Sequence, residues 1–113
     1  MTFKIDHTNI NALDFQKSYD FYTSKLGLKE IHRKETDRYI IAKFRDSSGS
    51  NHEFEITHLK DRKEPYDLSD NEIHIGFRVD DYASSLAKHQ AEGIVNYVSE
   101  EMGIYFIVDP DGY

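Results

Sequence analysis

The chain has 113 residues, a formal net charge of −7 at pH 7 and no cysteine. This length suffices for one domain with a modest core. The acidic balance argues against nucleic-acid binding, which depends on Lys and Arg neutralising phosphates. No apolar run approaches the roughly 20 residues of a membrane span. The lack of cysteine excludes disulfides and thiolate chemistry and fits a cytoplasmic protein, so any metal must be held by His and carboxylates.

The first 60 residues predict a strand, a helix and three further strands. Residues 2–12 alternate between polar and apolar side chains, which is typical of a strand. Asp14 is a suitable N-cap for a helix that runs to about Leu26, and Gly27 is a suitable residue to end it. The aromatic stripe of this helix predicts core packing. The three strands that follow are predicted at 28–35, 38–44 and 52–60.

After a polar connector, the same order begins again. Residues 71–80 predict a strand. Asp80 or Asp81 caps a helix through about Glu92, and we expect Leu86 and several alanines of this helix to face inward. The remaining predicted features are a helix stop at Gly93, strands at 94–99 and 103–108, and a turn at 109–112.

The two halves form an internal repeat. His7 and His74 are 67 residues apart, and so are Asp14 and Asp81. A repeat of this kind sets the architecture, because each copy is one supersecondary unit. The pattern predicts an α+β fold of two tandem βαβββ modules. We expect one domain over 1–113, with a first module over 1–60 and an incomplete second module over 72–113.

Three side chains of metal-binding type fall on one predicted face. Successive strand residues point to opposite sides of a sheet. If the apolar residues of the strands pack beneath the helices, then His7, Glu55 and His74 lie on the opposite face, where two imidazoles and a carboxylate make a metal-ligand set. The apolar residues expected under the second helix are Ile73, Ile75, Phe77 and Val79.

The other candidate residues have simpler interpretations. The pair Asp80 and Asp81 is interpreted as a helix cap, and "DPDG" as a turn that lacks the further oxygen ligands of a calcium loop. Glu53 and Glu72 share the predicted metal face and are expected at its rim. The histidines interpreted as surface residues are His32, His52, His58 and His89.

The stretches "FYTSKLGLKE", "FEITHL", "HIGFRVDD" and "DPDGY" resemble the vicinal oxygen chelate superfamily, and within it glyoxalase I, also called lactoylglutathione lyase. The resemblance implies two βαβββ modules that form a curved mixed sheet around a divalent metal. It assigns His7 and Glu55 of the first module and His74 of the second as ligands. The fourth ligand of the family, a Glu on the last strand, would fall at about position 116. The last strand is therefore truncated here, and we expect the natural protein to continue past Tyr113.

The resemblance also implies a reaction. A thiol and a 2-oxoaldehyde such as methylglyoxal form a hemithioacetal, which the lyase isomerises to a thioester. Glu55 would move the proton through an enediolate, which a nickel or zinc ion stabilises as a Lewis acid. The implied protein is a cytoplasmic homodimer that acts on a small molecule and binds neither nucleic acid nor a membrane.

Some positions depart from the glutathione-using relatives. Asn11 and Leu59 stand where those relatives often have Arg and Asn, and Glu100 and Glu101 would repel an anionic thiol. The sequence therefore favours metal-dependent chemistry over glutathione as the particular thiol. Two alternatives remain open: a non-catalytic small-molecule binding protein of the bleomycin-resistance type, and another metal-dependent reaction on this fold, as in ring-cleaving dioxygenases and fosfomycin-modifying transferases.

Overall fold

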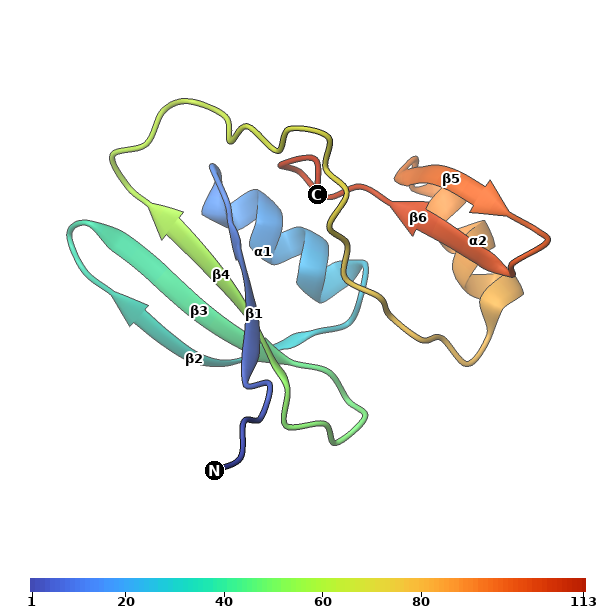
Figure 1. The fold of residues 1–113 in the computed structure, drawn as a ribbon. Coiled ribbons are helices and arrows are strands. Elements are labelled where there is room, and N and C mark those ends of the chain that lie inside the picture. Colours follow the sequence, from blue (N-terminus) through green and yellow to red (C-terminus); the bar gives the residue numbers. More distant parts are fainter. The chain divides into compact units, whose positions relative to one another are not determined.

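The structure, a computed structural model, describes residues 1–113 and divides into two units, Met1–Tyr66 and Asp67–Tyr113. In each unit one helix packs beside a β-sheet (Figure 1). The elements of the first unit are β1 (His7–Asn11), α1 (Phe15–Ser24), β2 (Lys29–Glu35), β3 (Tyr39–Arg45) and β4 (Glu53–Leu59).

The four strands of the first unit form a mixed sheet in the order β1-β4-β3-β2. β1 pairs with β4 in parallel, whereas β4 with β3 and β3 with β2 are antiparallel. In the parallel pair, His7 is opposite Glu53 and Asn9 is opposite Glu55. This register places the odd-numbered residues of both strands on the same face of the sheet.

Helix α1 covers the other face and builds the core. Asp14 caps it by accepting a hydrogen bond from the backbone N–H of Lys17 at 3.1 Å, and Gly27 follows in a left-handed conformation with φ of 70°. Both predictions for this helix are confirmed. The ring of Tyr22 lies 4.4 Å from that of Phe54 between centroids. The ten apolar residues of the core are Ile10, Ala12, Phe15, Phe21, Tyr22, Leu28, Ala42, Phe44, Phe54 and Ile56.

The second unit contains α2 (Tyr82–Ala91) and an antiparallel pair of strands, β5 (Val95–Ser99) and β6 (Ile104–Ile107). Asp81 is the N-cap of α2, as predicted, and Gly93 follows the helix with φ of 74°. The predicted turn at 109–112 is also confirmed. Its buried Asp109 accepts hydrogen bonds from the backbone N–H groups of Asp111 and Tyr113 at 2.9 and 3.0 Å.

The predicted strand at 71–80 is wrong, because these residues form neither a helix nor a strand. The apolar side chains expected beneath α2 are exposed instead, by 37–88%. The physical reason is pairing: in the first unit β1 is held by β4, whereas β5 and β6 pair with each other and leave this segment without a ladder. These exposed residues are Ile73, Ile75, Phe77 and Val79.

The predicted inner face of α2 is also partly wrong. Its alanines are exposed and Leu86 is half-buried, whereas His89, which we expected at the surface, is 5% exposed. The Nδ1 atom of His89 lies 2.9 Å from the hydroxyl oxygen of Tyr105 on β6. The polar ring of His89 can be buried here because the hydroxyl of Tyr105 provides a hydrogen-bonding partner. Burial raises the pKa of Tyr105.

The fold class is therefore α+β, with two helices and a mixed sheet, as the sequence predicted. Neither helix has the length and apolar composition needed to cross a membrane.

The core of the first unit should be far more sensitive to truncation than the exposed segment 72–79. Ile56→Ala removes a side chain with no exposure and should lower the free energy of unfolding by about 2–5 kcal/mol. Ile73→Ala is the matched control, because Ile73 is 88% exposed, and it should cost less than about 0.5 kcal/mol. Urea denaturation of both variants measures the difference. Equal losses would show that residue 73 packs in a core.

The cap of α2 should titrate below the usual range of an aspartate. Hydrogen bonds from the backbone N–H and hydroxyl of Ser84 lower the pKa of Asp81 from its ordinary 3.8. Because the folded pKa is the lower one, the cap stabilises α2 fully above the unfolded pKa and is lost as pH falls through the folded value. An NMR titration of the Asp81 carboxyl carbon tests this. Ser84→Ala should raise the pKa towards 3.8, and a wild-type value at or above 3.8 would contradict the assignment.

Candidate functional site

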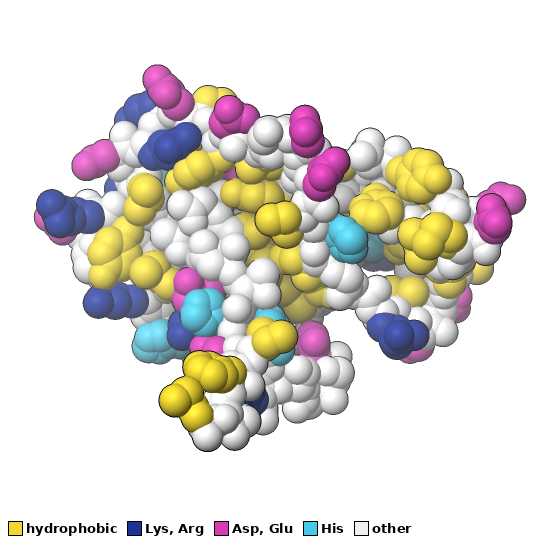
Figure 2. Space-filling model, viewed as in Figure 1, with side chains coloured by type: hydrophobic (Ala, Val, Ile, Leu, Met, Phe, Trp, Pro, Cys, Tyr) yellow, Lys and Arg dark blue, Asp and Glu magenta, His cyan; other side chains and the backbone are white.

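The face of the first sheet that points away from α1 carries most of the candidate chemistry. The register places Asn9 of β1 opposite Glu55 of β4, and Glu55 opposite Lys43 of β3. On the visible face of the molecule, acidic, basic and histidine side chains gather together over this unit near the N-terminus (Figure 2). This charged face contrasts with the α1 side, where Phe44, Phe54 and Ile56 are buried.

His7 lies between two carboxylates. Its Nδ1 atom is 2.8 Å from Oδ2 of Asp6, and its Nε2 atom is 4.0 Å from Oε1 of Glu55. The hydrogen bond with His7 lowers the pKa of Asp6. An ionised carboxylate can only accept, so this hydrogen bond requires a proton on Nδ1 of the His7 ring. The structure thus brings together two of the three predicted site residues.

Glu55 is the more enclosed member of this pair. Its side chain is 14% exposed, against 41% for His7. Its second oxygen, Oε2, lies 4.0 Å from Nζ of Lys43. The amide of Asn9 fits its neighbours when its nitrogen faces Glu55 Oε1 at 2.9 Å and the hydroxyl of Thr57 at 2.7 Å. Glu55 is therefore held on both oxygens, with Oε1 directed towards His7.

Glu53 lies on the same strand face but has a different environment. Its carboxylate forms an ion pair with Arg45 at 2.8 Å and lies 3.7 Å from Lys43. Two cations therefore neutralise the charge of Glu53. This environment indicates a structural carboxylate rather than a metal ligand. The charges of Arg45 and Lys43 are in turn engaged by acids on their own sheet.

The donor pair suits a divalent metal. A neutral imidazole Nε2 and an ionised carboxylate are both lone-pair donors, and 4.0 Å is too long for a hydrogen bond between them. Zinc binds N and O ligands at about 2.0–2.2 Å in tetrahedral geometry, so two ligand atoms of one ion lie about 3.4 Å apart. Nε2 of His7 and Oε1 of Glu55, at 4.0 Å, are slightly further apart than this separation. Within either unit, no group of three or more His, Asp or Glu side chains is arranged to hold a metal ion.

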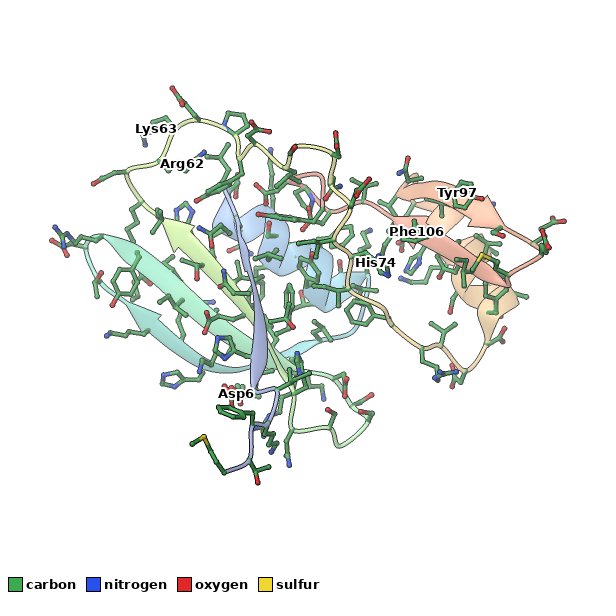
Figure 3. The ribbon with its side chains drawn as sticks, in the orientation of Figure 1. Asp6, Arg62, Lys63, His74, Tyr97 and Phe106 are labelled. Atoms are coloured by element: carbon green, nitrogen blue, oxygen red, sulfur yellow. The ribbon has the colours of Figure 1, made fainter.

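His74, the third predicted ligand, belongs to the second unit and lies in the exposed segment 72–79. Its ring meets that of Phe106 edge-on, with 5.4 Å between centroids, and Tyr97 lies on the far side of Phe106 at 6.2 Å (Figure 3). This aromatic contact brings no second metal-binding side chain to His74.

Three residues around the pair were missed by sequence reasoning: Asp6, Asn9 and Lys43. Alternation along a strand puts Asn9 on the same face as His7 but gives no reason to connect it with Glu55. Lys43 could have been found only from the register of β3 against β4. The strand predicted at 2–12 included Asp6, but β1 begins only at His7, so the predicted start is wrong and strand alternation does not place Asp6.

The other histidines are simple cases. His32 and His52 are exposed, as predicted. His58 lies on the face opposite Glu55, and it is half-buried rather than at the surface as predicted. Its ring is 6.4 Å from that of Phe15, and its Nδ1 atom is 3.1 Å from the carbonyl oxygen of Ala12.

The fold agrees with the comparisons with known proteins. Residues 4–113 match the family described as the Glyoxalase/Bleomycin resistance protein/Dioxygenase superfamily, and the chain belongs to this family. The lactoylglutathione lyase of Neisseria meningitidis serogroup A is 34% identical over 95% of this chain and 83% of its own length. The lactoylglutathione lyase of Escherichia coli O157:H7 is 31% identical over 95% and 85%.

Solved structures of the same fold extend the comparison. The trypanothione-dependent glyoxalase I of Leishmania major is 27% identical, with a TM-score of 0.83 over 99% of this chain and 83% of that chain. A fosfomycin resistance protein from Listeria monocytogenes, solved with Mn(II), is 15% identical with a TM-score of 0.74 over 98% and 87%. The second likeness shows the fold alone. The family match and the relatives named lactoylglutathione lyase thus define the class of protein to which this chain belongs.

Proposed function

We propose that this protein is a metal-dependent lyase of the glyoxalase I type. It isomerises the hemithioacetal of a thiol and a 2-oxoaldehyde, such as methylglyoxal, to a thioester. The observation that carries the proposal is the pair of lone-pair donors on the polar sheet face, His7 Nε2 and Glu55 Oε1, separated by 4.0 Å. Relatives of 30–34% identity named lactoylglutathione lyase support the same reaction class.

The ligands proposed for the metal are His7, Glu55 and His74, and the donor set of imidazole and carboxylate suits nickel or zinc. When bound, the cation supplies a Lewis acid for the negative charge that develops on the substrate oxygens. Glu55 has a second role as the base. Its enclosure and its contacts to Asn9 and Lys43 hold it in one orientation, which a proton transfer over a short distance needs.

The proton balance of the reaction needs one base and no redox partner. Glu55 removes the proton from the carbon that bears the hydroxyl and the sulfur, and it returns that proton to the neighbouring carbonyl carbon. The proton of the hydroxyl passes to the former ketone oxygen, so the hydroxyl carbon becomes the thioester carbonyl and the former ketone becomes the alcohol. No electron leaves the substrate, because the oxidation of one carbon balances the reduction of the other.

The thiol is proposed to carry less negative charge than glutathione. The strand face beside Glu55 offers neutral groups: Asn9, Asn11 and Thr57. The cations Lys43 and Arg45 on this face are engaged by Glu53. The trypanothione dependence of the Leishmania protein supports a variable thiol on this fold, since that protein takes a thiol other than glutathione.

We further propose that the protein is a homodimer and that it is located in the cytoplasm. The support is the resemblance to glyoxalase I and the cysteine-free composition. The competing function is a non-catalytic small-molecule binding protein of the same superfamily. The two carboxylates around His7 favour the metal-dependent lyase, because a simple apolar binding site has no use for them.

Turnover should depend on an added divalent metal and on Glu55. With nickel or zinc, the wild-type protein should isomerise a hemithioacetal of methylglyoxal, and chelation should abolish this. Glu55→Gln removes the base and should lower kcat by at least about 100-fold. Glu53→Gln is the matched control from the same strand face and should keep most of the activity. A folded protein that neither binds metal nor turns over would favour the binding-protein alternative.

The thiol preference should respond to one cation beside the site. Asn11→Arg supplies a guanidinium on the face of Glu55, and a charge-assisted hydrogen bond to a carboxylate contributes about 1.5–3 kcal/mol. The ratio of kcat/KM for the glutathione adduct to that for the adduct of a neutral thiol should rise by about tenfold. Asn11→Gln controls for the loss of the native amide. A wild-type protein that already prefers glutathione would contradict the proposed thiol.

A further inference from the structure

Asp6 is the one acid at this face that sequence reasoning did not use, and its position is fixed by the sheet. Its backbone carbonyl accepts a hydrogen bond from the N–H of Glu53 at 3.1 Å, directly before β1 and β4 begin to pair. Asp6 therefore stands at the first rung of the parallel ladder, at the start of β1 (Figure 3). Its side chain is 75% exposed, so a substitution there removes no core contact.

The carboxylate of Asp6 reaches the nitrogen of His7 that faces away from Glu55. Oδ2 of Asp6 is 2.8 Å from Nδ1, whereas Nε2 is directed to Glu55. The two ring nitrogens of a neutral imidazole cannot both carry a proton. The hydrogen bond at one nitrogen therefore decides the state of the other. With the proton held at Nδ1, the lone pair of Nε2 faces Glu55 Oε1.

We infer that Asp6 is a positioning residue for His7: it fixes the Nδ1–H tautomer and the ring orientation, and so presents Nε2 as a metal ligand beside Glu55. This inference rests on the proposed metal-dependent function. Asp6 does not touch the metal or the substrate and acts through His7 alone. Partners that orient metal-binding histidines in this way commonly change metal affinity by 10–100-fold when they are removed. Because Asp6 is largely exposed, we expect the lower end of that range.

Three substitutions separate orientation from charge. Asp6→Ala removes the acceptor and the charge. Asp6→Asn removes the charge but keeps an oxygen that can accept from Nδ1–H, so it should recover part of the effect. Asp61→Ala is the matched control, because it removes the same charge from an exposed aspartate beyond the opposite end of β4. All measurements are made near physiological ionic strength, where general surface electrostatics are largely screened.

The first measurement is the tautomer of His7 in the metal-free protein. The ¹⁵N chemical shifts of the ring report which nitrogen is protonated, at a pH well above the ordinary imidazole pKa. The wild type and Asp6→Asn should show the Nδ1–H form, and Asp6→Ala should move towards the Nε2–H form. This readout does not depend on metal or on activity.

The second measurement is the dissociation constant for zinc, determined by competition with a chelator. Asp6→Ala should weaken binding by about tenfold, Asp6→Asn by less, and Asp61→Ala by less than about twofold. An unchanged tautomer in Asp6→Ala, with zinc affinity equal to that of the control, would overturn the inference and leave the lyase proposal intact. A tautomer that depends on Asp6 in a protein that binds no metal would support the orientation of His7 and overturn the metal centre.

Discussion

The parallel pairing of β1 with β4 is the constraint on which the candidate site depends. Parallel neighbours cannot be joined by a hairpin, and here α1, β2 and β3 all intervene between them. The register sets Asn9 beside Glu55 and His7 beside Glu53, so His7 and Glu55 meet on one face. A slip of one residue would turn the carboxylate of Glu55 towards α1, where Phe54 and Ile56 now pack. The packing of the buried face against α1 thereby determines which side chains lie on the polar face.

Sequence patterns predicted most of the first unit because each element there obeys a local rule. Asp14 and Gly27 bound α1, and alternation along β4 separates the buried Ile56 from Glu55. The same alternation placed His7 and Glu55 on one face, whereas their proximity depends on the register of β1 with β4. The positions of Asp6 and Lys43 did not, since they depend on where a strand begins and on how β3 is aligned with β4, and neither is encoded in a period of two.

The second unit shows the limit of such rules. Residues 72–79 alternate as clearly as β1, yet they form no strand, because alternation describes only the capacity of a segment to pair. β5 and β6 form backbone hydrogen bonds with each other, and residues 1–113 contain no strand that pairs with this segment as β4 pairs with β1. His89 is a similar case. Its burial depends on the hydroxyl of Tyr105, 16 positions away in the sequence, and a solitary histidine gives no sign of that partner.

Two carboxylates of β4 show how environment divides roles on one strand face. Glu53 is held by Arg45 at 2.8 Å and by Lys43 at 3.7 Å, so its charge is already matched within the sheet. Glu55 has one cation at 4.0 Å on one oxygen, while the other oxygen faces a histidine nitrogen that Asp6 leaves without a proton. Two facing lone-pair donors repel each other unless a cation lies between them. This difference in environment is why Glu55, rather than Glu53, is the carboxylate proposed as a metal ligand.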